Sequence, residues 1–337
     1  MVTAPEEQAH EPLTADTFDD GDSAISAPTT GLTSLRSSVL KFQEENGRTY
    51  HAMSGGKYSF PNDERESERL DLQHNLWLLT LQGELGLSPK ATHGAKRVLD
   101  AGTGTGVWAI EYADQYPEAE VVGVDLSPIQ PALVPPNCSF EVDDLEKDWL
   151  WAGKFDFIFA RVMTACFTDM EDFIRKAYDN LEPGGYLEMQ DLAVPYTSDD
   201  GTLTPDNPIS RFSALCVEAS DAAKRPMYLA PYYKTYLERA GFVDVVERRF
   251  KWPLNEWPKD PHYKELGIWT KENLNTGLEA ILMALFTRYL RWSREQVLVF
   301  CEEVRRALKD PRVHGYIPIY VVYGRKPGHA PGTEETA

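Results

Sequence analysis

A glycine-rich turn directly after a short apolar segment constrains the fold of this chain more than any other feature. Val98 and Leu99 lead into Asp100, and glycines then follow at every second position. Because glycine lacks a Cβ, it allows sharp backbone turns and close approach of a ligand. The pattern therefore predicts a strand, a ligand-binding loop and a helix in succession. The three glycines are Gly102, Gly104 and Gly106.

Apolar segments of strand length alternate with helical segments from this turn to residue 191. We expect further strands at about residues 121–125, 137–146, 155–163 and 186–191. Such alternation predicts right-handed βαβ units in an open α/β sheet with helices on both faces. Beyond residue 191 we expect helices, a strand at 242–254, a long helical stretch at about 263–309 and a closing strand at 314–327.

The ends of the chain differ in composition from its middle. Residues 1–34 hold seven acidic residues and no Lys or Arg, and such a segment buries too little apolar surface to fold. We interpret it as a disordered acidic tail, and residues 328–337 as a second disordered tail. Residues 35–95 are expected to form an N-terminal helical lid segment, beginning with a helix over 33–45. A second helix, capped by Asn62 or Asp63, follows in that segment.

Charge and cysteine content exclude several classes of function. The 34 Lys and Arg residues against 53 Asp and Glu give a net charge of −19, which argues against general binding to a nucleic-acid backbone. Four cysteines stand far apart without a CxxC pair, so we expect neither a metal site nor disulfides. We find no apolar run of membrane-spanning length and no signal-like N-terminus, and we expect a cytoplasmic protein with no membrane partner.

Two cofactors compete for the glycine loop. A nicotinamide dinucleotide favours GxGxxG, but the third glycine here falls one position early and Asp100 would repel a pyrophosphate. S-adenosylmethionine (SAM) has a cationic ammonium and sulfonium and no phosphate, so it suits this carboxylate. Asp125 and Asp144 follow the next two strands, where they can accept hydrogen bonds from the ribose hydroxyls and the adenine amino group. Leu126 and Leu145 are expected to sandwich the purine.

The stretches RVLDAGTGTGVW, DLSPIQP, VPPN and LEPGGYLEMQD resemble the class I SAM-dependent methyltransferases. More narrowly, they resemble the fungal LaeA-like group, over about residues 56–327. The resemblance implies a Rossmann-like, mostly parallel sheet of seven strands with one antiparallel strand near the end. It also implies a methyltransferase domain over 96–327, with a helical insertion at about 255–310 before the last strand.

The resemblance further implies contacts to SAM from the loop before the lid helix, the glycine loop and the strand ends. The expected cofactor-binding residues are Tyr58, Asp100, Gly102, Thr103, Gly104, Gly106, Asp125, Leu126, Asp144, Leu145 and Arg161.

Candidates on the acceptor side are fewer. His74 lies on the expected lid helix and is a candidate general base, with a packing role as the alternative. Trp77, Gln190 and Trp269 are candidate substrate-binding residues, although aromatics at helical spacing are more often part of a core. Cys166 follows the fourth strand, in a segment without the Asn/Asp-Pro-Pro-Tyr/Phe tetrad of nucleic-acid amino methylases, and we interpret it as a buried helix residue.

These features support three hypotheses for function. The first is methyl transfer from SAM to a small, largely apolar fungal metabolite at O, N or S. The second is a LaeA-like regulator of secondary metabolism acting in a nuclear protein complex. The third is a SAM-binding scaffold without turnover. The sequence does not determine the oligomeric state.

Overall fold

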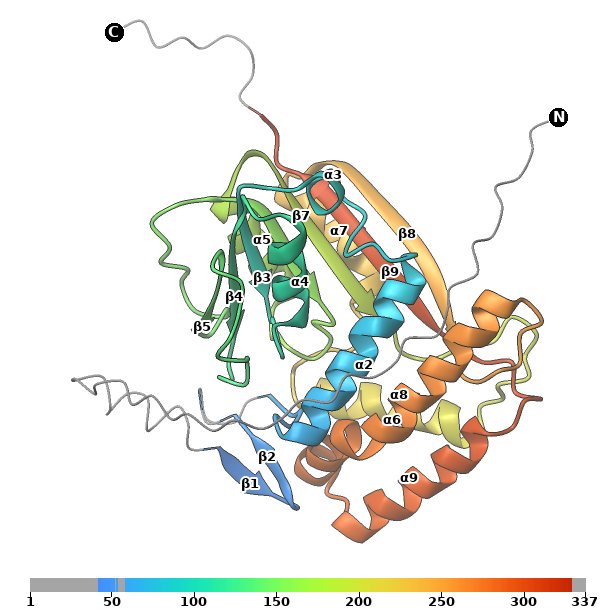
Figure 1. Cartoon of the computed structure of the whole chain (residues 1–337). Helices are drawn as coiled ribbons and strands as arrows, with labels where there is room; N and C mark the ends of the chain where they lie inside the picture. Colours follow the sequence, from blue (N-terminus) through green and yellow to red (C-terminus); the bar gives the residue numbers. More distant parts are fainter. Residues whose placement is uncertain (1–41, 52, 54–57, 329–337) are drawn as a thin grey trace, which may run out of the picture.

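The computed structural model describes residues 42–51, 53 and 58–328, and its centre is a seven-stranded sheet (Figure 1). The strand order is β5-β4-β3-β6-β7-β9-β8. The first five strands of that order pair in parallel, and β9 is antiparallel to both of its neighbours. The strands are β3 (Arg97–Ala101), β4 (Glu120–Asp125), β5 (Cys138–Val142), β6 (Phe155–Arg161), β7 (Leu181–Leu192), β8 (Val243–Pro253) and β9 (Tyr316–Arg325).

Helices cover both faces of this sheet. On one face α4 (Val107–Gln115) buries Trp108 and Tyr112 against Phe157 and Phe159, and the Trp108 and Phe159 rings stack with centroids 3.8 Å apart. On the other face α5 (Met170–Asn180) and α7 (Tyr233–Ala240) pack on β6, β7 and β9. The expected Rossmann-like α/β fold is therefore confirmed.

A layer of helices lies at the end of the sheet where β3, β4 and β6 terminate (Figure 1). It consists of α2 (Glu64–Thr80), α6 (Pro208–Ala222), α8 (Pro261–Leu285), the π-helix η3 (Phe286–Leu290) and α9 (Arg294–Leu308). These elements share one apolar core that includes Leu76, Phe212, Leu278 and Val304. The helical insertion before the last strand corresponds to α8, η3 and α9. Short elements complete the fold: α3 (Pro89–His93) and η2 (Ala230–Tyr232).

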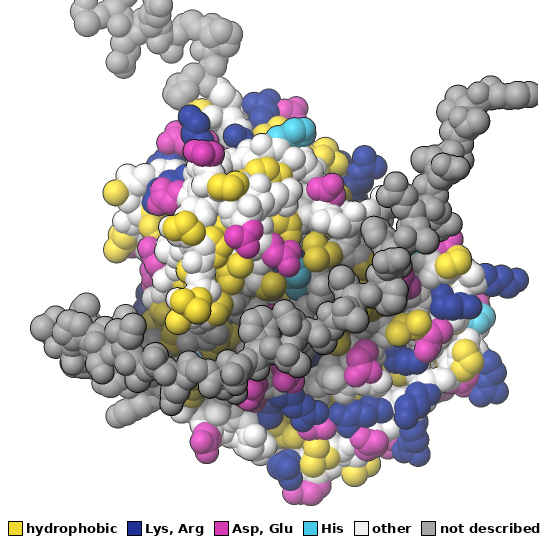
Figure 2. All heavy atoms as spheres, viewed as in Figure 1, with side chains coloured by type: hydrophobic (Ala, Val, Ile, Leu, Met, Phe, Trp, Pro, Cys, Tyr) yellow, Lys and Arg dark blue, Asp and Glu magenta, His cyan; other side chains and the backbone are white. Residues whose placement is uncertain are grey.

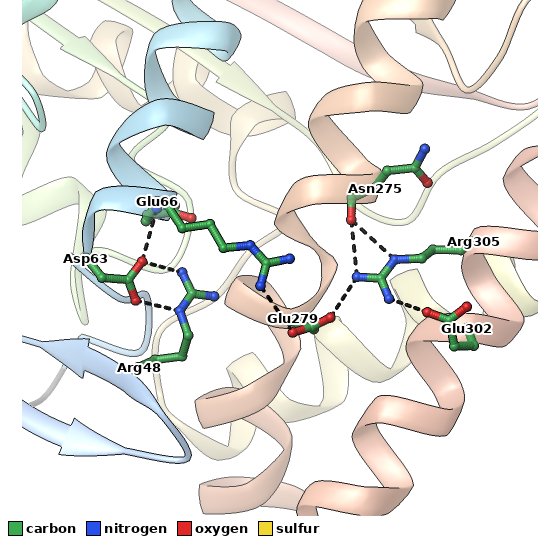
Figure 3. Close-up of polar contacts among 8 residues, drawn as sticks. Arg48, Asp63, Glu66, Asn275, Glu279, Glu302 and Arg305 are labelled. Atoms are coloured by element: carbon green, nitrogen blue, oxygen red, sulfur yellow. Dashed lines mark hydrogen bonds and ion pairs between the residues drawn. The ribbon is translucent and has the colours of Figure 1, made fainter.

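Ion pairs join α2 to α8, α8 to α9, and the start of α2 to β2 (Figure 3). Glu279 on α8 accepts from Arg305 of α9 at 2.8 Å and lies 3.5 Å from Arg65 of α2. Asp63 caps α2 by accepting the Glu66 amide, as expected. Its two carboxylate oxygens also accept hydrogen bonds from Nε and Nη2 of Arg48, at 2.5 and 2.7 Å. Figure 2 shows basic side chains over α8 and α9 interspersed with acidic ones.

The predicted helix over residues 33–45 is wrong where the structure describes it. Residues 43–45 form β1 (Gln43–Glu45), which pairs antiparallel with β2 (Arg48–Tyr50). The turn between them is Asn46-Gly47, with φ angles of 54° and 80°, and this dipeptide strongly favours two-residue hairpin turns. Residues 33–41 of that predicted helix lie outside the described residues, as do the whole predicted tail at 1–34 and residues 329–337.

Candidate functional site

Three acidic residues meet at one edge of the sheet. Asp100 and Asp125 lie at the carboxyl ends of β3 and β4, and Asp144 follows β5 by two residues. Because these strands are parallel neighbours, their ends share one edge, which is where open α/β sheets bind ligands. All three side chains line the same cavity.

The glycine loop lines this cavity, and its backbone conformation favours glycine. Gly102, Gly104 and Gly106 have φ angles of 75°, 58° and 83°, in the left-handed region. A Cβ on Gly106 would collide with the ring of Phe140, and one on Gly102 would lie 3.0 Å from Met163. The loop is therefore built for close packing as well as for close approach of a ligand.

Asp125 is held in place by two backbone amides. Its Oδ2 accepts from Gly104 at 3.0 Å, and its Oδ1 accepts from Ser127 at 2.9 Å. Burial raises the pKa of Asp125 to about 6, and these hydrogen bonds oppose the shift. The carboxylate retains acceptor capacity on each oxygen, which suits a pair of vicinal hydroxyls.

Asp100 is almost completely buried and accepts a 2.5 Å hydrogen bond from the Thr103 hydroxyl. Burial raises the pKa of this carboxyl to about 6, while Thr103 and the charge of Arg161 lower it. Arg161 lies at the end of β6 and lines the same cavity. A carboxylate and a guanidinium on one cavity complement the ammonium and carboxylate of a free amino-acid group.

Leu126 and Leu145 are the two residues predicted to hold the purine. Leu126 and Leu145 both line the cavity beside Asp144, whose Oδ1 accepts from the Glu146 amide at 3.1 Å. Tyr58 also lines it, and burial raises the pKa of its hydroxyl well above the usual range. The structure thus brings all the predicted cofactor residues but Gly106 to one cavity, and Gly106 caps α4 next to the glycine loop.

His74, the predicted general base, does not line this cavity. The imidazole is only 2% exposed, with Nε2 2.9 Å from Glu111 and Nδ1 2.9 Å from Arg161. Burial, reinforced by the charge of Arg161, lowers the pKa of His74 to about 3. The ring is thus enclosed by its neighbours, and it contacts the cavity through Arg161.

The three predicted substrate-binding residues do not line the cavity either. Trp77 belongs to the helical core, where its ring meets that of Trp252 edge-on at 4.9 Å. Gln190 is fully buried and donates to the Leu85 carbonyl at 3.1 Å. Trp269 packs half-buried against the helical core.

Cys166 lies in the turn between β6 and α5 and lines the cavity, so its predicted place on a helix is wrong. The preceding residues Val162 and Ala165 have φ angles of 54° and 62°, which a helix does not accommodate. Burial raises the pKa of the Cys166 thiol, which favours its protonated form.

Sequence reasoning missed two groups of cavity residues, most of them from the helical layer. The first, which we call the apolar wall, comes from α6, α8, β9 and the segment after β7. It consists of Tyr196, Phe212, Cys216, Leu274, Ile281 and Ile317. The second is a buried polar group of Glu66, Arg69 and Asn273. Hydrophobic spacing on α6 and α8 was visible in the sequence, but it does not distinguish a core-facing side chain from a cavity-facing one.

The polar group is internally paired. Arg69 donates to Glu66 at 2.7 Å and to the Asn273 amide oxygen at 2.8 Å. Gly277 makes room for it, since a Cβ there would lie 2.8 Å from the Arg69 side chain.

Within the described residues, no three His, Cys, Asp or Glu side chains are grouped so that they could hold a metal ion. None of the helices in that part of the chain is long and apolar enough to cross a membrane.

The fold and the acidic strand-end cavity define a class of α/β proteins that bind a cofactor bearing an amino acid and a nucleoside. Residues 72–247 match a family described as "Methyltransferase domain". Methyltransferase pytC of Aspergillus terreus is 41% identical over 88% of this chain and 91% of its own length. The secondary metabolism regulator LAE1 of Cochliobolus heterostrophus is 37% identical, over 84% and 94%. Protein-methionine methyltransferase laeA of Emericella nidulans is 33% identical, over 85% and 77%.

The chain therefore belongs to the SAM-dependent methyltransferases, together with these fungal relatives. The expected class of enzyme and its cofactor are confirmed.

Proposed function

We propose that this protein transfers the methyl group of SAM to an O, N or S atom of a small, largely apolar fungal metabolite. The observation that carries the proposal is that polar residues and an apolar wall line one and the same cavity. Strand-end carboxylates and the glycine loop form its cofactor side, and the apolar wall lies on the same cavity. Burial of an acceptor against such a wall is favourable because it removes apolar surface from water.

The chemistry of the donor set fits SAM. Asp125 suits the ribose hydroxyls, Asp144 the adenine amino group, and Asp100 with Arg161 the amino-acid end. Bound SAM supplies an electrophilic methyl group on a sulfonium, which an acceptor atom takes by in-line displacement. The protein contributes by orienting both partners and by limiting the access of water, since residues of the glycine loop, α2 and the apolar wall line the cavity.

The polar group of Glu66, Arg69 and Asn273 narrows the acceptor class. The Arg69 charge is already neutralised by Glu66, and both side chains are less than a tenth exposed. An additional ionised group beside this pair would carry the full cost of burying a charge without a partner. A neutral hydroxyl, carbonyl or amide is therefore the group that these residues are best suited to hold, and the remainder of the acceptor lies on the apolar wall.

Label transfer tests the proposal. The purified protein is incubated with methyl-labelled SAM and either the small-molecule fraction or the protein fraction of a fungal extract. Label in organic-soluble small molecules, lost in the Phe212→Asp variant while the affinity for S-adenosylhomocysteine is retained, supports it. Phe212→Leu, which keeps the wall apolar, serves as the matched control.

The relatives named as a regulator and as a protein-methionine methyltransferase favour a second candidate, methylation of a protein in a regulatory complex. Label confined to the protein fraction would support that candidate and reject the first. Cofactor binding with no label in either fraction would identify a SAM-binding scaffold.

A further inference from the structure

His74 joins three elements at the methionine end of the cavity. It lies on α2, its Nδ1 is 2.9 Å from Nη2 of Arg161 at the end of β6, and its Nε2 is 2.9 Å from Oε2 of Glu111 on α4. The ring is 2% exposed, whereas the Glu111 side chain is 43% exposed. The contact thus runs from a surface carboxylate, through a buried imidazole, to a guanidinium that lines the cavity.

The chemistry of arginine fixes the direction of these hydrogen bonds. A guanidinium has only donors, so Arg161 donates and the Nδ1 lone pair of His74 accepts. The single proton of the neutral ring is then on Nε2, from which it donates to the Glu111 carboxylate. The lowered pKa of His74, caused first by burial and then by Arg161, agrees with a neutral ring.

Arginine has a long side chain whose head group takes many positions unless neighbours hold it. Arg161 is surrounded by groups that could direct it: the charges of Asp100 and Glu111, and the Phe159 ring, whose centre is 5.9 Å from the guanidinium carbon. Its hydrogen bond to His74 fixes the orientation of the guanidinium, because Nη2 is directed at His74. The remaining donors are left for a ligand beside Asp100.

We propose that His74, with its proton orientation set by Glu111, is a positioning residue that aims Arg161 at the carboxylate of the methionine part of SAM. This inference rests on the cofactor placement in the proposed function. In this role His74 is not a general base: it affects the affinity for SAM, not the methyl-transfer step.

Two amides of different length separate this role from simple packing. Asn at position 74 places an oxygen where Nδ1 lies, so it retains an acceptor for Arg161 and loses the Glu111 contact. Gln places its amide near Nε2, so it retains the Glu111 contact and loses the acceptor for Arg161. Binding is measured by calorimetry with S-adenosylhomocysteine and with 5′-methylthioadenosine, which has the same nucleoside and thioether but no amino-acid carboxylate.

We expect His74→Gln to weaken S-adenosylhomocysteine binding about tenfold, the effect of one lost hydrogen bond to a charged group. His74→Asn should remain within about threefold of the unaltered protein, and methylthioadenosine should bind all three alike. Glu111→Leu, at a position where the side chain is 43% exposed, should weaken S-adenosylhomocysteine binding about threefold and leave methylthioadenosine binding unchanged. This second variant keeps the test decisive if a substitution at His74 prevents folding.

Equal losses for the two ligands in the Gln variant, or in Glu111→Leu, would overturn the positioning role alone and indicate a general structural effect. Equal behaviour of the Asn and Gln variants would do the same. If the unaltered protein binds neither ligand, the cofactor placement fails and this inference fails with it.

Discussion

Replacing Asp125 should strongly weaken cofactor binding. Its two oxygens already accept the Gly104 and Ser127 amides at 3.0 and 2.9 Å, which leaves about one acceptor position on each. If each remaining position holds one ribose hydroxyl, Asp125→Ala removes two hydrogen bonds to a charged group, each contributing about 1.5–3 kcal/mol. The expected loss is at least about 3 kcal/mol, or roughly a hundredfold in Kd.

The assay is calorimetric titration of S-adenosylhomocysteine at pH 8, where a carboxyl with a pKa of about 6 is ionised. Asp125→Asn keeps the shape but offers one oxygen, so we expect an intermediate loss of about tenfold. Asp114→Ala, on the exposed face of α4, removes the same charge elsewhere and serves as the control.

Affinity within threefold of the unaltered protein in Asp125→Ala, with an unchanged melting temperature, would refute the ribose assignment. So would an equal loss in Asp114→Ala, because the effect would then come from net charge.

Three further outcomes follow from the same residues. Gly106→Ala should lower the free energy of unfolding, measured with denaturant, by several kcal/mol, because left-handed strain of about 1–2 kcal/mol adds to a steric clash with Phe140. Gly201→Ala, at φ 75° with open space around it, should lower it by the strain alone, and equal losses in the two variants would reject the clash. Because burial raises the pKa of Asp100 and of Asp125 to about 6, S-adenosylhomocysteine affinity should fall at least tenfold from pH 7.5 to pH 5, and a flat calorimetric profile would contradict those pKa values. Trp77→Ala should lower the free energy of unfolding by about 3–5 kcal/mol, because Trp77 is a buried core residue. Trp77→Phe should keep its turnover, and a loss of turnover in that variant at an unchanged melting temperature would support a substrate role.

The sheet and the cofactor side of the cavity were predictable because their signals are local. A strand that ends in a carboxylate and enters a glycine loop specifies its own geometry, and parallel neighbours bring Asp100 and Asp125 to the same edge. The Asn46-Gly47 hairpin was also readable from two residues, yet helical spacing before it suggested a helix instead.

The apolar wall was not predictable, because it depends on how helices far apart in sequence pack together. Phe212 on α6 and Leu274 on α8 belong to the apolar core and line the cavity as well, and periodicity alone gives both roles the same pattern. His74 meets Arg161 across 87 residues of chain, a contact that only the docked lid helix creates. Because the His74 ring is buried, it contacts Arg161, which lines the cavity, but does not line the cavity itself.

A crystal structure with bound S-adenosylhomocysteine would test the central claim most directly. The account predicts ribose hydroxyls at hydrogen-bond distance, about 3 Å, from the Asp125 carboxylate, and the amino-acid group between Asp100 and Arg161. It also predicts that the sulfur faces the space bordered by Phe212 and Leu274. A ligand bound elsewhere, or a sulfur directed away from the apolar wall, would contradict it.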